Sequence, residues 1–304
     1  MRVKVLGSAA GGGFPQWNCN CRNCDGVRSG ALHALPRTQS SIAVSSDGMR
    51  WVLFNASPDI LQQLKATPEL QPARAIRDTG IESVVLIDAQ IDHTTGLLML
   101  REGQRPLRIF CTDMVREDLT TGNPLFRILE HYCGVEWHRI GGDRWTFSIP
   151  GADALEFTAM PLKSAAPPYS PHRHDPHPGD NIGVRVTDTT SGRSLFYAPG
   201  LGEIEPHVER TMRAADCVMV DGTFWTDEEM IELGISVKRA REIGHLPQSG
   251  AGGMMEWLDR FEKPRKILIH INNTNPILND DAPERAELAA RGIELAFDGM
   301  DIRI

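Results

Sequence analysis

Residues 84–96 read VVLIDAQIDHTTG, and this stretch decides how the rest of the chain is interpreted. The four apolar residues 84–87 predict a short buried strand. From Asp88 onward the residues are polar or small, so the chain leaves the strand at that point. Asp88, Asp92 and His93 therefore follow directly on a buried strand, as expected where a strand leads into a functional site.

Similar apolar runs and amphipathic stretches recur along the whole chain, and no linker-like tract separates them. The predicted strands cover 1–6, 40–44, 49–55, 84–87, 107–111, 154–160, 182–186, 194–198, 217–220 and 266–270. Helices are predicted at 58–64, 226–233, 253–261 and 283–291. The pair Asp47-Gly48 predicts a two-residue hairpin turn. We interpret residues 1–304 as a single α/β domain, because strands and helices alternate and candidate site residues come from both halves.

Composition excludes several classes of function. The chain has 304 residues, 41% of them apolar, which is enough for a large core. Its net charge of -8 argues against nucleic-acid binding, which needs a surplus of Lys and Arg. The N-terminus breaks into glycines too early for a signal peptide, and no run of about 18 apolar residues predicts a membrane span. We therefore expect a cytoplasmic protein.

Three of the six cysteines lie in a C-x-C-x-x-C pattern at Cys19, Cys21 and Cys24. Thiolates this close together can face one tetrahedral ion, and zinc prefers such ligands. Free cysteines or a local disulfide are the alternatives. The pattern predicts a structural Zn²⁺, whose fourth ligand comes from elsewhere in the chain. The other three cysteines lie in apolar or mixed surroundings and are interpreted as small packed side chains: Cys111, Cys133 and Cys217.

The pattern Asp92-His93-x-x-Gly96 resembles the end of the H-x-H-x-D-H motif of the metallo-β-lactamase superfamily. That resemblance implies an αββα sandwich and a late strand that ends in a histidine, as His270 does. Asp88 and Gln90 stand where the superfamily has its first two histidines. Its third histidine is replaced by Lys163-Ser164, and its bridging aspartate has no counterpart in Ala198-Pro199-Gly200.

A narrower resemblance rests on several segments together. The cysteine pattern, PRTQSS at 36–41, the altered motif and DGTFW at 221–225 resemble the family of coenzyme PQQ synthesis protein B. The closing FDGMD at 297–301 is also shared with the phosphodiesterase branch of the superfamily. The resemblance covers the whole chain and implies a step in making pyrroloquinoline quinone (PQQ) from a ribosomal peptide. The implied partners are that precursor peptide or its Glu-Tyr fragment, PQQ itself and other PQQ biosynthesis proteins; a homodimer is left open.

The surviving ligands favour one ion. A dinuclear hydrolase needs two ions about 3.5–4 Å apart, and the ligands of the first are missing. Asp92, His93 and His270 remain, and two imidazoles with one carboxylate form the facial triad of non-haem Fe²⁺ oxygenases. Asp221 is predicted as a further ligand or as a partner of a ligand. His245 resembles the GHL histidine of zinc phosphodiesterases and is a candidate catalytic residue. A helix-capping turn, a turn aspartate and a structural histidine are the corresponding alternatives.

Two further features depend on the resemblance or on local composition. Zinc phosphodiesterases place a histidine of the zinc clip where this chain has Asn273, so Asn273 or His33 is the candidate fourth ligand.

The segment 167–179, PPYSPHRHDPHPG, has five prolines and is predicted to be a surface loop. Its histidines are interpreted as solvated, with a second ion or substrate contact as the alternative: His172, His174 and His177.

The hypothesis that accounts for the missing ligands is an Fe²⁺- and O₂-dependent hydroxylation of the precursor's tyrosine ring. A single iron with open coordination positions suits O₂ chemistry better than a two-ion hydrolytic site. One alternative is a carrier that helps to move PQQ or its precursor to the periplasm. Another is a mononuclear metal-dependent hydrolase.

Overall fold

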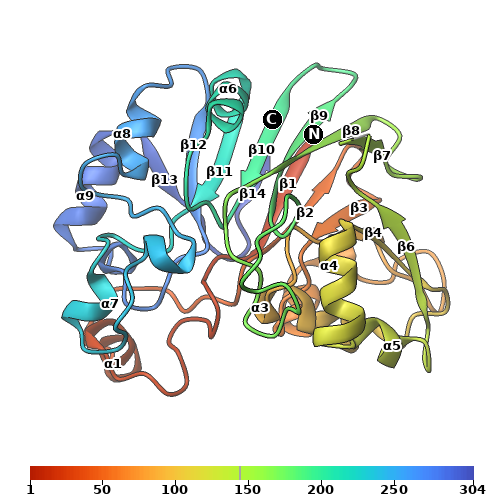
Figure 1. The fold of residues 1–304 in the computed structure, drawn as a ribbon, viewed down its shortest axis with the longest axis horizontal. Coiled ribbons are helices and arrows are strands. Elements are labelled where there is room, and N and C mark those ends of the chain that lie inside the picture. Colours follow the sequence, from red (N-terminus) through yellow and green to blue (C-terminus); the bar gives the residue numbers. More distant parts are fainter. Residues whose placement is uncertain (144) are drawn as a thin grey trace.

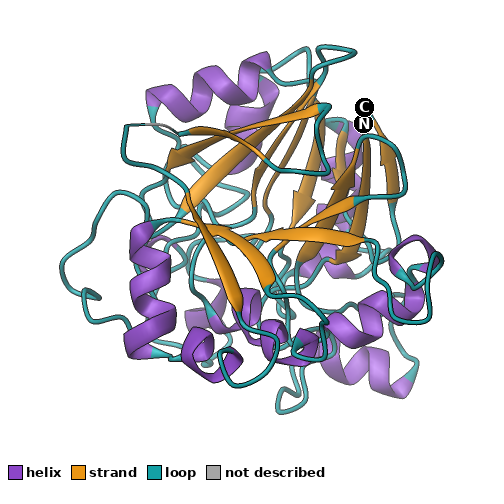
Figure 2. Ribbon diagram, turned by 90° about the vertical axis from the view of Figure 1, so that its right-hand side faces the viewer, coloured by secondary structure: helices purple, strands orange, loops and turns teal. Residues whose placement is uncertain are grey.

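The computed structural model describes residues 1–143 and 145–304. In this part of the chain two seven-stranded sheets pack face to face, with helices on both outer faces (Figures 1 and 2). Each sheet is mixed, with an antiparallel half and a parallel half. This arrangement is the αββα sandwich, so the predicted fold class is confirmed.

Each half of the chain forms one sheet, except that the last strand crosses back to join the first sheet. From edge to edge, the first sheet contains β14 (Asp301–Arg303), β1 (Arg2–Gly7), β2 (Ser41–Ser45), β3 (Trp51–Phe54), β4 (Ile81–Val85), β5 (Leu107–Cys111) and β6 (Val135–Arg139). The second contains β13 (Ile293–Leu295), β12 (Arg265–Ile269), β11 (Cys217–Asp221), β10 (Ser194–Ala198), β9 (Ile182–Asp188), β8 (Leu155–Pro161) and β7 (Thr146–Ser148).

Most helices cover the outer faces because they bury an apolar side against a sheet. The α-helices are α1 (Arg22–Ser29), α2 (Ile60–Ala66), α3 (Ile91–Thr94), α4 (Asp113–Glu117), α5 (Leu125–Leu129), α6 (Pro206–Ala214), α7 (Glu229–Glu232), α8 (Met254–Asp259) and α9 (Pro283–Ala290). Residues of α2, α4 and α5 pack on the first sheet. Residues of α1, α6, α8 and α9 pack on the second sheet.

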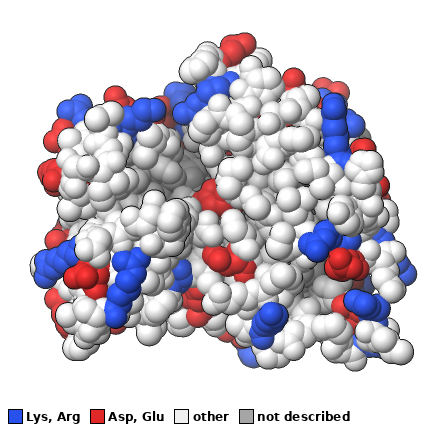
Figure 3. All heavy atoms as spheres, turned by 90° about the horizontal axis from the view of Figure 1, so that it is seen from below, with Lys and Arg blue, Asp and Glu red and all other residues white. Residues whose placement is uncertain are grey.

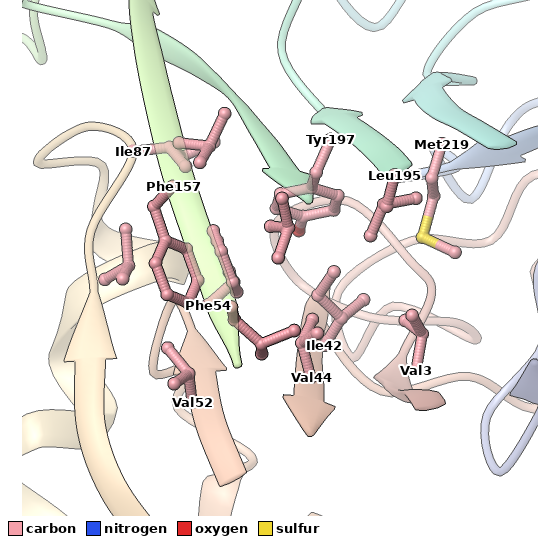
Figure 4. Packing of buried hydrophobic residues seen from close by; sticks show 14 of the residues in the cluster. Val3, Ile42, Val44, Val52, Phe54, Ile87, Phe157, Leu195, Tyr197 and Met219 are labelled. Atoms are coloured by element: carbon pink, nitrogen blue, oxygen red, sulfur yellow. The ribbon is translucent and has the colours of Figure 1, made fainter. Parts of the chain in front are cut away.

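An apolar layer fills the space between the sheets (Figure 4). Phe54 of β3 meets Tyr197 of β10 edge to face, with ring centroids 5.5 Å apart. Phe157 of β8 lies 6.3 Å from Phe54 by the same measure. All three side chains are fully buried, so this aromatic cluster ties the two sheets together.

The sequence predicted most of these strands but placed some boundaries differently. The bounds of β5 and β10 match the prediction. The strand predicted at 84–87 begins earlier and ends at Val85, and residues 86 and 87 continue as buried loop. The predicted two-residue turn at Asp47-Gly48 is a longer connection between Ser45 and Trp51, because the Asp47 carboxylate accepts hydrogen bonds from the amides of residues 49 and 50.

Other corrections concern helices and small elements. The helix predicted at 226–233 is only the single turn α7, where Trp225 N donates to the Glu229 carboxylate instead of continuing a ladder. Helices α1, α3, α4, α5 and α6 and strands β6, β7, β13 and β14 were not predicted from the sequence. As predicted, the segment 167–179 contains neither helix nor strand.

The two ends of the chain meet at the edge of the sandwich (Figure 1). Strand β14 pairs with β1, and the Met1 ammonium lies 2.8 Å from the Asp188 carboxylate. Across the described residues, every helix is too short or too polar to cross a lipid bilayer.

The aromatic cluster generates a stability prediction. Replacing Phe157 with alanine should lower the free energy of unfolding by about 3–5 kcal/mol, because a buried ring leaves a cavity between the sheets. Ile76→Ala, at a side chain that is 99% exposed, is the control and should change it by less than about 0.5 kcal/mol. Urea denaturation followed by circular dichroism measures both. Equal unfolding midpoints for the two variants would contradict the role given to this layer.

Candidate metal centre and cysteine clip

A carboxylate and two imidazoles meet where the two sheets come together at one edge. Asp92 and His93 lie on α3, just beyond β4 of the first sheet, and His270 directly follows β12 of the second. The ligand atoms of these three residues lie within 4.8 Å of one another. His270 Nε2 is 3.3 Å and His93 Nε2 is 3.8 Å from Asp92 Oδ2. The structure therefore brings the predicted triad together.

The orientation of His93 is fixed by Asp88. His93 Nδ1 lies 2.7 Å from Asp88 Oδ1, and both side chains are buried. A carboxylate can only accept, so Nδ1 carries a proton and Nε2 is the nitrogen that faces the rest of the centre. Among the described residues, buried Nε2 has no hydrogen-bond partner. A buried Nε2 without a partner near Asp92 fits a metal ion, which would bind this nitrogen in place of a proton.

His270 is held in an unusual backbone conformation. Its φ is +63°, in the left-handed region that few residues other than glycine adopt. Such strain costs about 1–3 kcal/mol and gathers at functional sites. His270 Nδ1 lies 2.9 Å from the Thr223 hydroxyl, which leaves Nε2 on the side of Asp92.

Asp221 holds its neighbours in place from the end of β11. Its carboxylate is fully buried and accepts hydrogen bonds from Leu201 N at 2.8 Å and Thr223 N at 2.9 Å. His245 Nδ1 lies 2.7 Å from Asp221 Oδ2, and the His245 ring stacks on His270 with centroids 5.4 Å apart. Of its two predicted roles, this geometry favours a partner of histidines over a ligand. Because His245 Nδ1 is bound to Asp221, its Nε2 is the nitrogen available to the site.

The charges in this centre reinforce one another. Burial lowers the pKa of His93, but the Asp88 and Asp92 carboxylates more than offset this and raise it to about 9. Burial raises the pKa of Asp92, but His93 and His270 hold it well below its usual range. Figure 3 shows Asp and Glu atoms in the hollow on the lower face of the molecule. The buried carboxylates therefore attract a cation to this centre.

The positions of the missing histidines have other roles in this chain. Asp88 is bound to His93, and Asn181 Nδ2 also approaches it at 3.4 Å. Lys163 points to Glu203, 3.1 Å away, and is 60% exposed. No carboxylate of residues 198–200 enters the site, because those residues are Ala, Pro and Gly. Among the described residues, Asp221, His245 and His270 also lie close enough to hold an ion, but this group shares His270 with the triad and its carboxylate already lies 2.7 Å from His245 Nδ1.

The cysteine clip is assembled from the start of α1, the residues just before it and the segment after β12. The sulfurs of Cys19, Cys21 and Cys24 lie within 4.8 Å of one another. The Asn273 amide faces all three, at 3.0, 3.6 and 3.3 Å. Turning that amide over would place its oxygen, the atom that can bind a metal, in the same position. His33 is exposed and pairs with an aspartate instead, so Asn273 is the candidate fourth ligand.

The cysteines differ in burial from what their polar surroundings suggested. Cys24 is fully buried and belongs to the apolar cluster beneath the second sheet. Burial raises the pKa of the Cys21 thiol to about 11, so a bound cation is needed to hold it as a thiolate at neutral pH. Of the cysteines outside the clip, Cys111 and Cys217 are buried and Cys133 is partly buried.

The histidine-rich loop lies beside the metal motif but does not supply its ligands. The Tyr169 hydroxyl donates to the Ala89 carbonyl, which ties the loop to the motif. His172 Nε2 lies 2.7 Å from Asp180, and His177 pairs with Asp175 at 3.4 Å. His174 is exposed. In the described part of the chain, none of these histidines belongs to a group of potential metal ligands.

Two functional residues were not recognised from the sequence. Asp88 was interpreted only as a lost ligand, although a carboxylate five residues before a ligating histidine can anchor that histidine. Thr223 was considered only as part of a motif, although its hydroxyl contacts Asp221 and two histidines. The spacing Asp221-x-Thr223 at a strand end was the available signal.

The fold and the histidine–carboxylate centre define a protein of the metallo-β-lactamase type. The model of the family described as "Beta-lactamase superfamily domain" matches residues 50–271. The chain is 67% identical over 303 residues to coenzyme PQQ synthesis protein B of Methylobacillus flagellatus, and 99% of each chain is covered. Identity to the Azoarcus sp. (strain BH72) protein of that name is also 67%, over 304 residues and 99% of each chain. This chain belongs to the coenzyme PQQ synthesis protein B family.

Solved structures agree with this assignment. The crystal structure of Zn²⁺-bound PqqB from Methylobacterium extorquens matches with a TM-score of 0.89 and 35% identity, and both chains are covered completely. A diphosphatase of the PhnP family matches with a TM-score of 0.69 and 18% identity over 99% of this chain and 97% of that one. The second likeness shows a shared fold.

The clip gives a metal-content prediction. Cys21→Ser should remove about one zinc ion per chain and destabilise the fold by several kcal/mol, because structural zinc binding is coupled to folding. Cys133→Ser, outside the clip, is the matched control and should keep its metal. Plasma mass spectrometry and thermal melts measure the two effects. Full zinc content in a triple Cys→Ala variant of the clip would sink this assignment.

The triad gives a separate prediction. His93→Ala and His270→Ala should each lose the second metal ion while the clip zinc and the melting temperature stay nearly unchanged. Open sites contribute less to folding than closed structural ones. His131→Ala, at an exposed histidine outside the centre, should retain both ions. Loss of soluble protein in both triad variants would show that these residues support the fold instead.

Proposed function

We propose that this protein acts in PQQ biosynthesis as a non-haem Fe²⁺- and O₂-dependent hydroxylase of the tyrosine ring of the precursor peptide or its Glu-Tyr fragment. The observation that carries this proposal is the triad of Asp92, His93 and His270. Asp221, His245 and His270 form a second group of potential ligands, but the Asp221 carboxylate there already accepts from Leu201 N and lies 2.7 Å from His245 Nδ1. One carboxylate and two imidazoles with open positions suit iron(II). Family membership supports the pathway.

The reaction has a defined balance. A ring C–H bond becomes C–OH, O₂ supplies the oxygen atom, and its second oxygen leaves as water. Two electrons and two protons complete the step, so a two-electron reductant is a co-substrate. Bound iron(II) would supply the O₂ chemistry, which zinc cannot, because Zn(II) is d¹⁰ and has no redox chemistry.

The chain's own residues have separate tasks in this proposal. Asp92, His93 and His270 hold the ion. His245 Nε2 accepts or returns a proton, because Asp221 stabilises the protonated ring: burial lowers the His245 pKa, but the Asp221 carboxylate more than offsets this and raises it. Asp88 keeps the His93 proton on Nδ1.

Two other functions would leave different traces. A carrier of PQQ or its precursor would bind the quinone tightly and release it unchanged. A mononuclear hydrolase would cleave ester or phosphodiester substrates without O₂, and the fold shared with a diphosphatase keeps it as the comparison. Neither alternative requires iron.

The test uses full-length protein reconstituted anaerobically with Fe²⁺, then mixed with a reductant, ¹⁸O₂ and either the precursor peptide or Glu-Tyr. The hydroxylated product should be heavier by one ¹⁸O atom in mass spectrometry. Zinc-loaded protein and His93→Ala should give no product, and His131→Ala should match the unaltered protein. Label only from water, or equal turnover with zinc, would defeat the hydroxylase proposal.

A further inference from the structure

We propose that Thr223 is a positioning residue whose hydroxyl sets the ring orientation and tautomer of His270 and supports those of His245. It does so by linking both rings to the buried carboxylate of Asp221. The inference rests on the metal centre of the proposed function but not on its O₂ chemistry, so it holds for any divalent ion bound there.

The hydroxyl lies at the meeting point of three groups. Thr223 Oγ1 is 2.6 Å from Asp221 Oδ1, 2.9 Å from His270 Nδ1 and 3.0 Å from His245 Nδ1. The Thr223 side chain is 2% exposed and Asp221 is fully buried, so water does not compete for these contacts.

Proton counting decides which group donates. A hydroxyl has one hydrogen and two lone pairs. The 2.6 Å contact to a carboxylate is the shortest of the three, and charge-assisted hydrogen bonds are the short, strong ones. Thr223 therefore donates to Asp221, and it can only accept from His270. His270 Nδ1 must carry a proton, so its Nε2, 3.3 Å from Asp92 Oδ2, is the nitrogen that would give its lone pair to an ion bound at Asp92.

The second histidine follows the same logic. His245 Nδ1 lies 2.7 Å from Asp221 Oδ2, so its proton goes to that oxygen, with the second lone pair of Thr223 beside it. The His245 and His270 rings are stacked at an interplanar angle of 21°. With both Nδ1 atoms on the same hydroxyl, the two Nε2 atoms are left on the other side of the rings.

Main-chain bonds hold Thr223 independently of its hydroxyl. Its carbonyl accepts from Asn272 N at 3.1 Å and from Asn275 Nδ2 at 3.2 Å, and its amide donates to Asp221. Valine has the same shape as threonine and keeps these bonds. Thr223→Val therefore removes the hydroxyl with little change in packing.

Without the hydroxyl, His270 Nδ1 has a buried proton and no acceptor. The ring can escape that cost by moving its proton to Nε2, and this tautomer has no lone pair on the nitrogen that faces the ion. Partners that orient ligating histidines are worth about 10–100-fold in metal affinity. We expect Thr223→Val to lose metal affinity by a factor in that range. Thr223→Ser, which keeps the hydroxyl, should bind the metal like the unaltered protein.

The experiment is chelator competition with Co²⁺ on full-length protein whose clip is filled with zinc. Thr223→Val should raise the Kd of the centre about 10–100-fold and change its Co²⁺ absorption bands. Thr223→Ser should resemble the unaltered protein. Thr67→Val is the control, since it removes a buried hydroxyl that bonds only to the Gln63 carbonyl. No oxidation is measured, so a failed hydroxylase test leaves this result intact.

Two outcomes would overturn the proposal. Unchanged affinity and absorption in Thr223→Val would show that the hydroxyl does not act on the histidines. A Thr223→Ser variant as weak as Thr223→Val would assign the effect to side-chain shape. If Thr223→Val does not fold, ¹⁵N NMR of histidine-labelled, zinc-loaded unaltered protein decides. Protons on Nδ1 of His245 and His270 are expected, and a proton on Nε2 of His270 refutes the inference.

Discussion

Packing of the two sheets against each other is the constraint on which the site depends. Asp92 and His93 follow a strand of one sheet, and Asp221 and His270 end or follow strands of the other. The two groups meet only because the apolar layer around Phe54 sets the distance between the sheets. The 3.3 Å distance between Asp92 Oδ2 and His270 Nε2, which belong to different sheets, therefore depends on core packing as much as on local sequence.

The centre shows how a small change of residue type changes the role of a position. Asp88 stands where related folds place a ligand, yet its carboxylate is turned to His93 and accepts a hydrogen bond from the ring. The Asp221 carboxylate likewise accepts a hydrogen bond from the His245 ring. The Thr223 hydroxyl lies within hydrogen-bonding distance of the His270 ring. Buried acceptors of this kind hold a proton on Nδ1 and so leave Nε2 as the nitrogen that faces the ion, and the protein thereby orients the ligands through atoms that do not touch the metal.

The α/β class could be predicted from local patterns, because apolar runs mark the strands, whereas the αββα sandwich and the triad followed from the resemblance of the Asp92-His93-x-x-Gly96 motif to the metallo-β-lactamase superfamily. The short strands β6 and β7 could not, since they are mostly exposed or half-buried and gain stability from pairing with a neighbour. The fourth ligand of the clip could also not be chosen from the sequence alone. Asn273 is distant from Cys19 in sequence, and His33 was an equal candidate until the fold placed it in solvent.

His270 and Asn273 lie on one short segment, and each belongs to a different candidate metal site. Asn23 of α1 donates to the carbonyls of Asn273 and Asn275. These hydrogen bonds fasten α1 to the segment that also carries His270 of the triad. Two residues, Ile271 and Asn272, lie between them and fix their spacing. During evolution, insertions and deletions can accumulate in the exposed loops of this protein, but one residue gained or lost in this interval would put both metal sites out of register at once.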